Sequence, residues 1–367
     1  HTFNSIHIES GGHWTADGSN HLTLSGENSN HFAFRNLGTY THTNGTVVIN
    51  NGGSMSHAAV QAGVATSTTG LYDLTISGGG TTSEIFGDTT IHRNMEAGGS
   101  ETVLRGALTV NGNLTVEGTL NTRYSSTDRN LTVTGNTVVS GTLTGNDSTL
   151  IFGESGVHGS TEAGALHVES GGSLTFGSGD LTAFSGFTAK GTNTVTSTGG
   201  GDILIKGRTN NGFMNSHGHT GVNITGDYKI DYDASALHDV RNNMAITAAN
   251  IIYPHGGRTY KFWTTATDST VTFTGNLLVS NGTAVLNTQA SGQEATDVFT
   301  VTGHTNLTGD LIANDTTMNL GSMFIGSNGE YSATSGTTTL TKEADTGGTD
   351  FMFYNDGTFT HNDGKFV

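Results

Sequence analysis

The chain has 367 residues, of which 55 are Gly, 1 is Pro, none is Cys and 12% are charged. This composition does not describe ordinary globular domains, and the abundance of Thr, Val, Ile and Phe in alternation argues against a disordered chain. The formal net charge of −17, from 14 Lys and Arg against 31 Asp and Glu, disfavours nucleic acid and anionic membrane surfaces as partners, because both require clustered basic residues. No apolar run approaches the roughly 20 residues that cross a bilayer, so membrane insertion is not expected.

A sequence phrase near the start returns at the end. Segments 32–48 and 351–367 both read Phe-x-Phe-x-Asn-x-Gly-Thr-aromatic-Thr-His-x-x-Gly, so that Phe32 aligns with Phe351 and Gly45 with Gly364. Nine matched positions without a gap indicate a chain built from reused units.

Between these segments, Thr or Asn alternates with Leu, Val, Ile or Phe over three to five residues, and each phrase closes at Gly. Such alternation places side chains on opposite faces of a strand, while Gly, Asn and Asp supply the positive φ that tight corners need. The sequence therefore predicts short strands that include 74–76, 108–110, 114–116, 131–133, 138–139, 203–205, 222–224 and 271–273.

Two further repeats give the spacing of these strands. Segment 108–120 aligns with 131–143, and segment 7–12 aligns with 167–172, each without a gap. The step from Leu108 to Leu131 suits one coil of a β-solenoid, in which three short strands and three corners make one turn. Strands this short do not suit an immunoglobulin-like sandwich.

We therefore expect an all-β fold, a right-handed parallel β-solenoid (β-helix) of roughly 20–28 residues per coil with an irregular inserted segment. Equivalent residues should then stack from coil to coil. The expected stacked pairs are Val110 with Val133, Gly112 with Gly135, and Leu120 with Leu143.

Segment 202–263 departs from the pattern. It holds six of the 14 basic residues, the only Pro, one of the two Trp and the helical spacing of Leu237, Val240 and Met244. The expected organisation is a β-solenoid over 1–201, an irregular insertion or widened coils over 202–263, and a β-solenoid over 264–367 that ends inside a repeat.

The same segment supplies the candidate glycan-binding residues Trp263, Asp231, Asp233 and Arg258, because solenoids usually recognise ligands on long corner loops and insertions. Asp231 and Asp233 alternate onto one strand face, at about the 5–9.5 Å carboxyl separation of glycosidases. Many unrelated carboxylates meet this criterion. We assign no catalytic residue and expect no enzymatic activity.

Metal sites are equally weakly indicated. Asp227 and Asp239, together with the two aspartates above, offer oxygen ligands to calcium, yet the Gly-Gly-x-Gly-x-Asp calcium repeat is absent. His217 and His219 alternate onto one face as zinc or nickel ligands do, but chance pairs are expected among 16 His. No metal and no cofactor is predicted, with calcium left as an open alternative.

The recurring His42 and His361 are expected to hydrogen-bond the adjacent coil. The second copy of the terminal repeat stops at Val367, the counterpart of Val48, which would leave a coil half made. We therefore expect a longer chain or another subunit to complete this coil, because exposed solenoid ends propagate by edge pairing.

The phrases at 71–76, 108–120 and 357–367 resemble repeats of large β-helical surface proteins, namely fibre and appendage proteins of tailed phages and bacterial adhesins similar to filamentous haemagglutinin. The resemblance leaves segment 202–263 outside. It implies an extracellular scaffold, trimeric or fibrous, and it supplies no catalytic residue.

The resulting expectation is a structural, non-enzymatic fibre or surface-appendage protein of a virion, located on the virion surface or, otherwise, at a cell surface. Its partners would be copies of itself or further fibre subunits, and any ligand would be a cell-surface polysaccharide. The alternatives are a bacterial adhesin and a polysaccharide-degrading enzyme of the tailspike type, either a glycoside hydrolase or a polysaccharide lyase.

Overall fold

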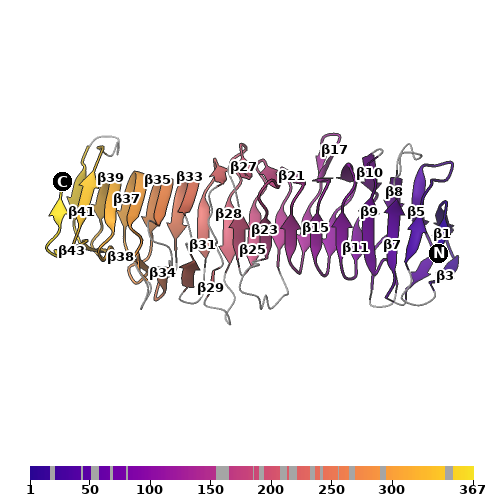
Figure 1. Cartoon of the computed structure of the whole chain (residues 1–367), viewed down its shortest axis with the longest axis horizontal. Helices are drawn as coiled ribbons and strands as arrows, with labels where there is room; N and C mark the ends of the chain where they lie inside the picture. The colour runs from indigo at the N-terminus through magenta and orange to yellow at the C-terminus, as the bar shows by residue number, and fades with distance from the viewer. Residues whose placement is uncertain are drawn as a thin grey trace. The chain divides into compact units, whose positions relative to one another are not determined.

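The structure is a computed structural model that describes residues 1–16, 21–42, 44–50, 58–66, 69–79, 82–153, 165–184, 186–189, 194–206, 213–214, 221–231, 236–239, 243–254, 256–263, 269–289, 295–343 and 350–367. Over these residues the secondary structure consists of strands and turns, with no helix. The chain divides into two compact units, His1–Gly159 with Ala165–Leu181, and Ser160–Gly164 with Thr182–Val367. Each unit is built from parallel strands that stack coil upon coil, which confirms the predicted parallel β-solenoid (Figure 1).

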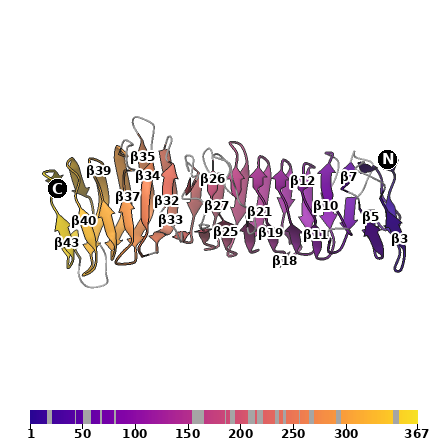
Figure 2. The same cartoon turned by 90° about the horizontal axis from the view of Figure 1, so that it is seen from below.

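Three stacks of parallel strands form unit 1 (Figures 1 and 2). The first stack contains β1 (Thr2–Phe3), β4 (Leu22–Leu24), β7 (Thr46–Asn50), β9 (Asp73–Ser77), β12 (Met95–Ala97), β15 (Leu114–Val116), β20 (Thr137–Val139) and β23 (Leu166–Val168). The second contains β2 (Ile6–Ile8), β5 (Phe32–Asn36), β8 (Ala58–Gln61), β10 (Thr82–Ile85), β13 (Glu101–Leu104), β16 (Thr119–Asn121), β21 (Thr142–Asn146) and β24 (Ser173–Phe176). The third contains β3 (His13–Thr15) with β6 (Thr39–Thr41), and β11 (Thr89–Ile91) with β14 (Leu108–Val110), β19 (Leu131–Val133) and β22 (Leu150–Phe152).

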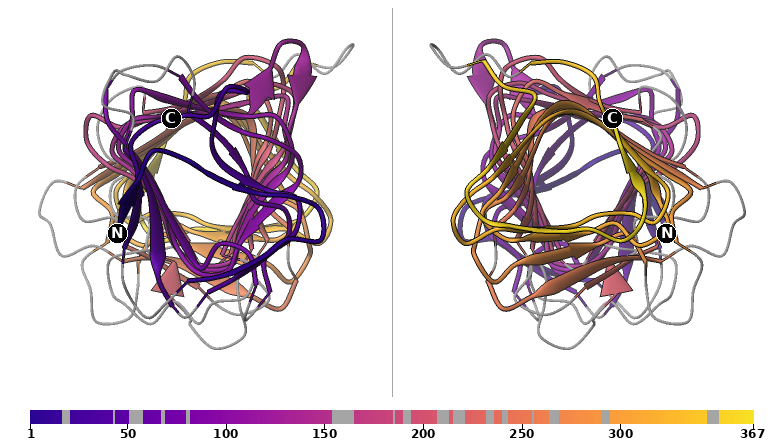
Figure 3. Two further views of the ribbon diagram at one scale, coloured as in Figure 1. Left: turned by 90° about the vertical axis from the view of Figure 1, so that its right-hand side faces the viewer. Right: turned by 90° about the vertical axis from the view of Figure 1, so that its left-hand side faces the viewer.

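The predicted stacking is confirmed residue by residue. Val110 pairs with Val133 and Leu120 with Leu143 in parallel register, and the Gly135 N–H donates a hydrogen bond of 2.9 Å to the Gly112 carbonyl. The Leu and Val side chains of these pairs are fully buried, so alternation does direct the apolar residues inward. Figure 3 shows the ribbon from its two ends, where the strands surround an interior. In unit 1 the buried Leu and Val side chains of these pairs belong to that interior.

Coil length varies more than the repeat at 108–143 suggests. The coils on either side of that repeat are shorter, since Thr89 pairs with Leu108 and Leu131 pairs with Leu150. The extra residues of the repeat belong to a small antiparallel hairpin, β17 (Arg123–Tyr124) and β18 (Thr127–Asp128), which projects from one corner (Figure 1). Other coils are longer still, because Met323 pairs with Phe353 in the next coil.

One corner of unit 1 carries a column of glycines. A Cβ on Gly118 would lie 1.6 Å from the Gly99 carbonyl oxygen, and one on Gly141 would lie 2.1 Å from the Gly118 carbonyl oxygen. These corners therefore need glycine because the backbones of successive coils approach too closely for a side chain.

Unit 2 repeats the three-stack arrangement, with four long strands that each cross two faces. One face is a sheet of seven strands, namely β29 (Phe213–Met214), β32 (Ala236–Asp239), β34 (Thr259–Trp263), β36 (Val285–Asn287), β38 (Asp310–Ile312), β40 (Glu330–Ser332) and β43 (Thr358–Thr360). The other two faces contain β27 (Val195–Ser197), β28 (Ile203–Lys206), β30 (Val222–Ile224), β31 (Tyr228–Asp231), β33 (Asn243–Tyr253), β35 (Thr270–Val279), β37 (Val298–Leu307), β39 (Thr317–Ile325), β41 (Thr337–Leu340), β42 (Phe353–Asn355) and β44 (Lys365–Phe366). The short strand β26 (Phe187–Ala189) also belongs to this unit. β25 (Leu181–Phe184) begins at the last residue of unit 1.

The described part of segment 202–263 takes part in this stacking. Ile203 pairs with Tyr228, and Tyr228 pairs with Ile251, all in parallel register. Leu237 and Met244 lie on strands, so the helical spacing does not produce a helix there, whereas Val240 lies outside the described residues. The helical spacing of these apolar residues does not produce a helix, because the adjacent coils offer each short strand a hydrogen-bonding edge on both of its sides.

The repeat of the two terminal segments corresponds to one recurring structural element. Segment 32–48 forms β5, β6 and the start of β7, and segment 351–367 forms β42, β43 and β44. The same Asn-to-Gly turn joins the first two strands in both copies: the Gly38 N–H donates to Asn36 Oδ1 at 3.2 Å, and the Gly357 N–H donates to Asn355 Oδ1 at 3.0 Å.

The two copies of the repeat at 7–12 and 167–172 form the same turn, but they do not occupy the same position around the coil. Its copies follow β2 in the second stack and β23 in the first, and in both the second Gly donates its N–H to the Glu carbonyl three residues earlier, at 2.8 Å for Gly12 and 2.9 Å for Gly172. One turn sequence thus serves two different corners.

Candidate functional site

Of the four predicted glycan-binding residues, the structure describes the side chains of two. Asp231 ends β31, directly opposite Lys206 of β28, and the half-buried Arg258 immediately precedes β34. Asp233 lies outside the described residues, as does the side chain of Trp263, whose backbone pairs with Asp239. The proposed grouping of these four residues therefore stays a prediction.

The calcium and histidine alternatives fall partly on the same undescribed positions. The Asp227 carboxylate already has a cationic partner within the protein, since Lys229 Nζ lies 3.6 Å from Asp227 Oδ2. The same ammonium group lies 2.5 Å from Asp202 Oδ2. The side chain of Asp239 and both His217 and His219 lie outside the described residues. Among the residues that are described, no three His, Asp or Glu side chains form a group that could hold a metal ion.

The recurring histidines differ in role. His42 is 5% exposed, and its Nε2 lies 3.4 Å from the Thr66 carbonyl oxygen of the next coil, which confirms the expected contact between coils. His361 is exposed and accepts a local hydrogen bond from the Asp363 N–H instead. Burial lowers the pKa of His42, and it also lowers that of His304, which the nearby Lys342 lowers further.

A carboxylate pair that sequence spacing did not reveal lies in unit 2. Asp310 on β38 pairs in parallel register with Glu330 on β40, so two acidic side chains occupy adjacent coils. Burial, and then the charge of Glu330, raise the pKa of the Asp310 carboxyl group. The Thr360 hydroxyl donates to Glu330 Oε1 at 2.9 Å.

A polar groove of about 330 Å³ crosses four coils of unit 1, over β7, β9, β12 and β15. Its lining residues form two columns, one of Thr46, Asp73, Asn94 and Asn113, and one of Thr75, Glu96 and Thr115, with Met95 between them. We call this feature the polar groove.

The first column of the polar groove is also a structural ladder. Asp73 Oδ1 accepts the Asn94 N–H at 2.8 Å, and Asn94 Oδ1 accepts the Asn113 N–H at 3.0 Å. Arg93 neutralises Asp73 through Nε–H at 3.0 Å and Nη2–H at 2.5 Å. The side-chain oxygens of this column thus hold successive coils together, while the carboxamide nitrogens of Asn94 and Asn113 have no hydrogen-bond acceptor in the described part of the chain.

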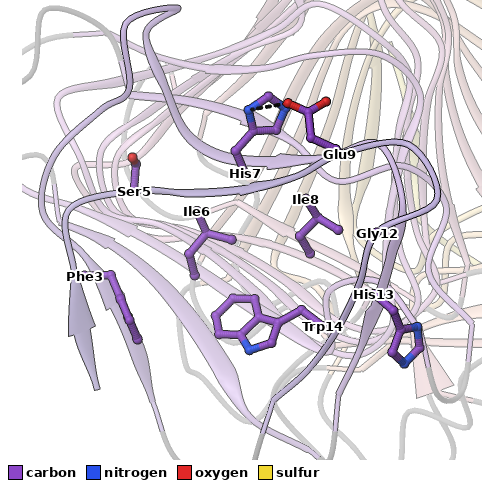
Figure 4. A pocket seen from close by; sticks show the side chains of 9 residues that line it. All are labelled: Phe3, Ser5, Ile6, His7, Ile8, Glu9, Gly12, His13 and Trp14. Carbon is purple, nitrogen blue, oxygen red and sulfur yellow. Dashed lines mark ion pairs between the residues drawn. The ribbon is translucent and has the colours of Figure 1, made fainter.

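A second hollow, of about 400 Å³, lies at the first coil of unit 1 (Figure 4). Ile6, Ile8 and Trp14 face one another across it, whereas His7 and Glu9 project from the other side of their strand. The His7 Nδ1 to Glu9 Oε1 distance is 3.6 Å. The hollow is therefore the apolar interior of a coil and brings no pair of carboxylates together.

No helix long and apolar enough to cross a membrane occurs in the part of the chain that the structure describes. In comparisons with known proteins, no family, no curated protein and no solved structure matches this chain.

Proposed function

We propose that the protein is a structural, non-enzymatic component of an extracellular fibre or surface appendage, on a virion. The observation that carries this proposal is the presence, in each unit, of side-chain ladders that bind one coil to the next in addition to the backbone hydrogen bonds. Proteins that must stay straight and resist unfolding gain from such ladders, because every coil is held by both of its neighbours.

The ladder of unit 2 illustrates the arrangement. Asn250 Nδ2 donates to Asp227 Oδ1 at 2.7 Å, Asn276 Nδ2 donates to Asn250 Oδ1 at 3.1 Å, and the His304 N–H donates to Asn276 Oδ1 at 2.9 Å. Three coils each contribute one short polar side chain and the fourth contributes a backbone N–H, so the ladder costs little conformational entropy. This pattern supports a scaffold that works by its stiffness.

Fibre function predicts association with copies of this chain or with further fibre subunits. The test is localisation: gold-labelled antibodies raised against the purified protein should bind along thin appendages of intact particles in electron micrographs. Labelling confined to bacterial cell surfaces would favour the adhesin alternative, and labelling of neither would refute a surface role.

The enzyme alternative is tested with the same preparation. We expect the purified protein to release no oligosaccharide from capsular or algal polysaccharides. Release of oligosaccharide would overturn the non-enzymatic proposal, and the Asp310 and Glu330 pair would then be the first to replace, because one raised carboxyl pKa beside a second carboxylate is the arrangement that glycosidases use.

A further inference from the structure

We propose that the polar groove of unit 1 binds a neutral polysaccharide chain that runs across the strands, along the stacking direction of the coils. The proposal deepens the surface role proposed above and rests on it for the source of the glycan, but the binding chemistry rests on the groove alone.

The groove presents hydrogen-bonding groups at regular intervals in two directions. Successive coils lie about 4.8 Å apart, and its two columns stand two residues apart on each strand, which is about 7 Å. Carboxamide donors at Asn94 and Asn113 line one side, and Thr75, Glu96 and Thr115 line the other with hydroxyl and carboxylate groups. A chain of sugar rings carries hydroxyl groups along both of its edges, and these groups both donate and accept.

The charge of the lining selects among polymers. Arg93 neutralises Asp73, whereas Glu96 makes no ion pair with any of the described residues, and no Lys or Arg lines the groove. An anionic glycan would therefore meet an uncompensated carboxylate, as would a nucleic acid. A neutral glycan meets hydrogen-bonding groups without a charge penalty.

An extended peptide fits the groove less well. Peptides that bind to β-sheets usually add a strand at a sheet edge, where unpaired backbone groups are exposed. The polar groove lies on the face of a parallel sheet, where the backbone groups of β9, β12 and β15 are already engaged by their neighbours. Recognition here has to come from side chains, as it does for sugars.

The ladder permits a variant that removes the donors and keeps the side-chain oxygens that accept hydrogen bonds from the next coil. Asn94→Asp with Asn113→Asp retains the Oδ1 atoms that accept the N–H groups of Asn113 and Asn136, at 3.0 and 2.9 Å, and eliminates both carboxamide NH₂ groups. Asn130→Asp is the matched control. Asn130 Oδ1 accepts the Thr149 N–H at 3.1 Å on another face of unit 1, outside the groove.

The experiment measures retention of the purified chain on immobilised neutral polysaccharides (laminarin, mannan, agarose) and anionic ones (alginate, carrageenan), followed by calorimetry with oligosaccharides of the retained polymer. We expect binding to at least one neutral polymer and none to the anionic ones. The double Asp variant should bind at least tenfold more weakly, while Asn130→Asp should bind as the wild type does.

The proposal would be overturned by retention on none of the neutral polymers, by equal affinity of the double variant and the wild type, or by an equal loss of affinity in Asn130→Asp. Binding of a protein partner in this groove without competition from saccharides would also overturn it. A surface fibre that binds no neutral glycan would leave the localisation result intact, so failure here is distinguishable from failure of the proposed function.

Discussion

Replacing Gly118 by Ala should destabilise unit 1, because the glycine column at its corner leaves no space for a methyl group. The added Cβ would lie 1.6 Å from the Gly99 carbonyl oxygen, whereas carbon and oxygen atoms in contact stay about 3.3 Å apart. The two coils must then separate locally, which disturbs the hydrogen bond from the Gly118 N–H to the Ala97 carbonyl (2.9 Å) and the one from the Thr142 N–H to the Gly118 carbonyl (2.7 Å).

The magnitude follows from these contacts. Overpacking costs about 1–3 kcal/mol, and two weakened hydrogen bonds cost about 0.5–1.5 kcal/mol each. The free energy of unfolding should therefore fall by about 2–6 kcal/mol. Guanidinium denaturation followed by circular dichroism measures this change, and hydrogen exchange should show faster opening over residues 97–118.

Gly79→Ala is the matched control, since a Cβ there meets no heavy atom within 4 Å. It should leave stability unchanged or raise it by about 0.4–1 kcal/mol through the unfolded state. If Gly118→Ala is as stable as Gly79→Ala, close approach of the coils is not the reason for the glycine column.

Three further predictions concern charge. Glu330→Gln should stabilise unit 2 by up to about 1 kcal/mol at pH 7, since like charges on paired strands destabilise. The gain should shrink as the pH falls and the Asp310 carboxyl group, whose pKa is raised, takes up its proton; a gain that stays constant on acidification would contradict this reasoning. Because burial lowers the pKa of His42 and His304, the unfolded chain binds protons more readily, so stability should be full above about pH 6.5 and fall as the pH drops below it. His304→Asn and His42→Asn should each flatten that decline in denaturation series from pH 8 to 5, and unchanged slopes would refute the assignment. Asp231→Asn with Asp233→Asn should leave assembly intact by analytical ultracentrifugation, whereas loss of assembly would assign these carboxylates a structural role.

The sequence predicted the strands and much of their stacking because both depend on local information. Alternation of apolar and polar residues fixes which side chains point inward, and the repeat at 108–120 and 131–143 fixes which coils are neighbours. The shorter coil length, such as that from Thr89 to Leu108, was not apparent from the sequence. The sequence repeat that gave the spacing, 108–120 with 131–143, spans a coil that includes the hairpin β17–β18.

The polar groove and the Asp310 and Glu330 pair could not be found in the same way. The step from Asp73 to Asn94 differs in length from the step from Asn94 to Asn113, so a fixed period does not align them. The number of residues in each corner determines which side chains become neighbours in adjacent coils. Corners differ in length without a clear sequence signal. Only the register of the folded coils brings these side chains together.

The hairpin β17–β18 shows that a corner can lengthen without a change in the interior. Leu108, Leu131 and Leu150 occupy one interior column, although the chain between the first two is longer than the chain between the last two. Insertions at corners are thus free of the packing constraint that acts on the strands. The outer surface of such a protein can diversify during evolution while its interior stays constant, and a foreign peptide inserted between Ser125 and Ser126 should be displayed at a defined position along unit 1 without loss of the coil register.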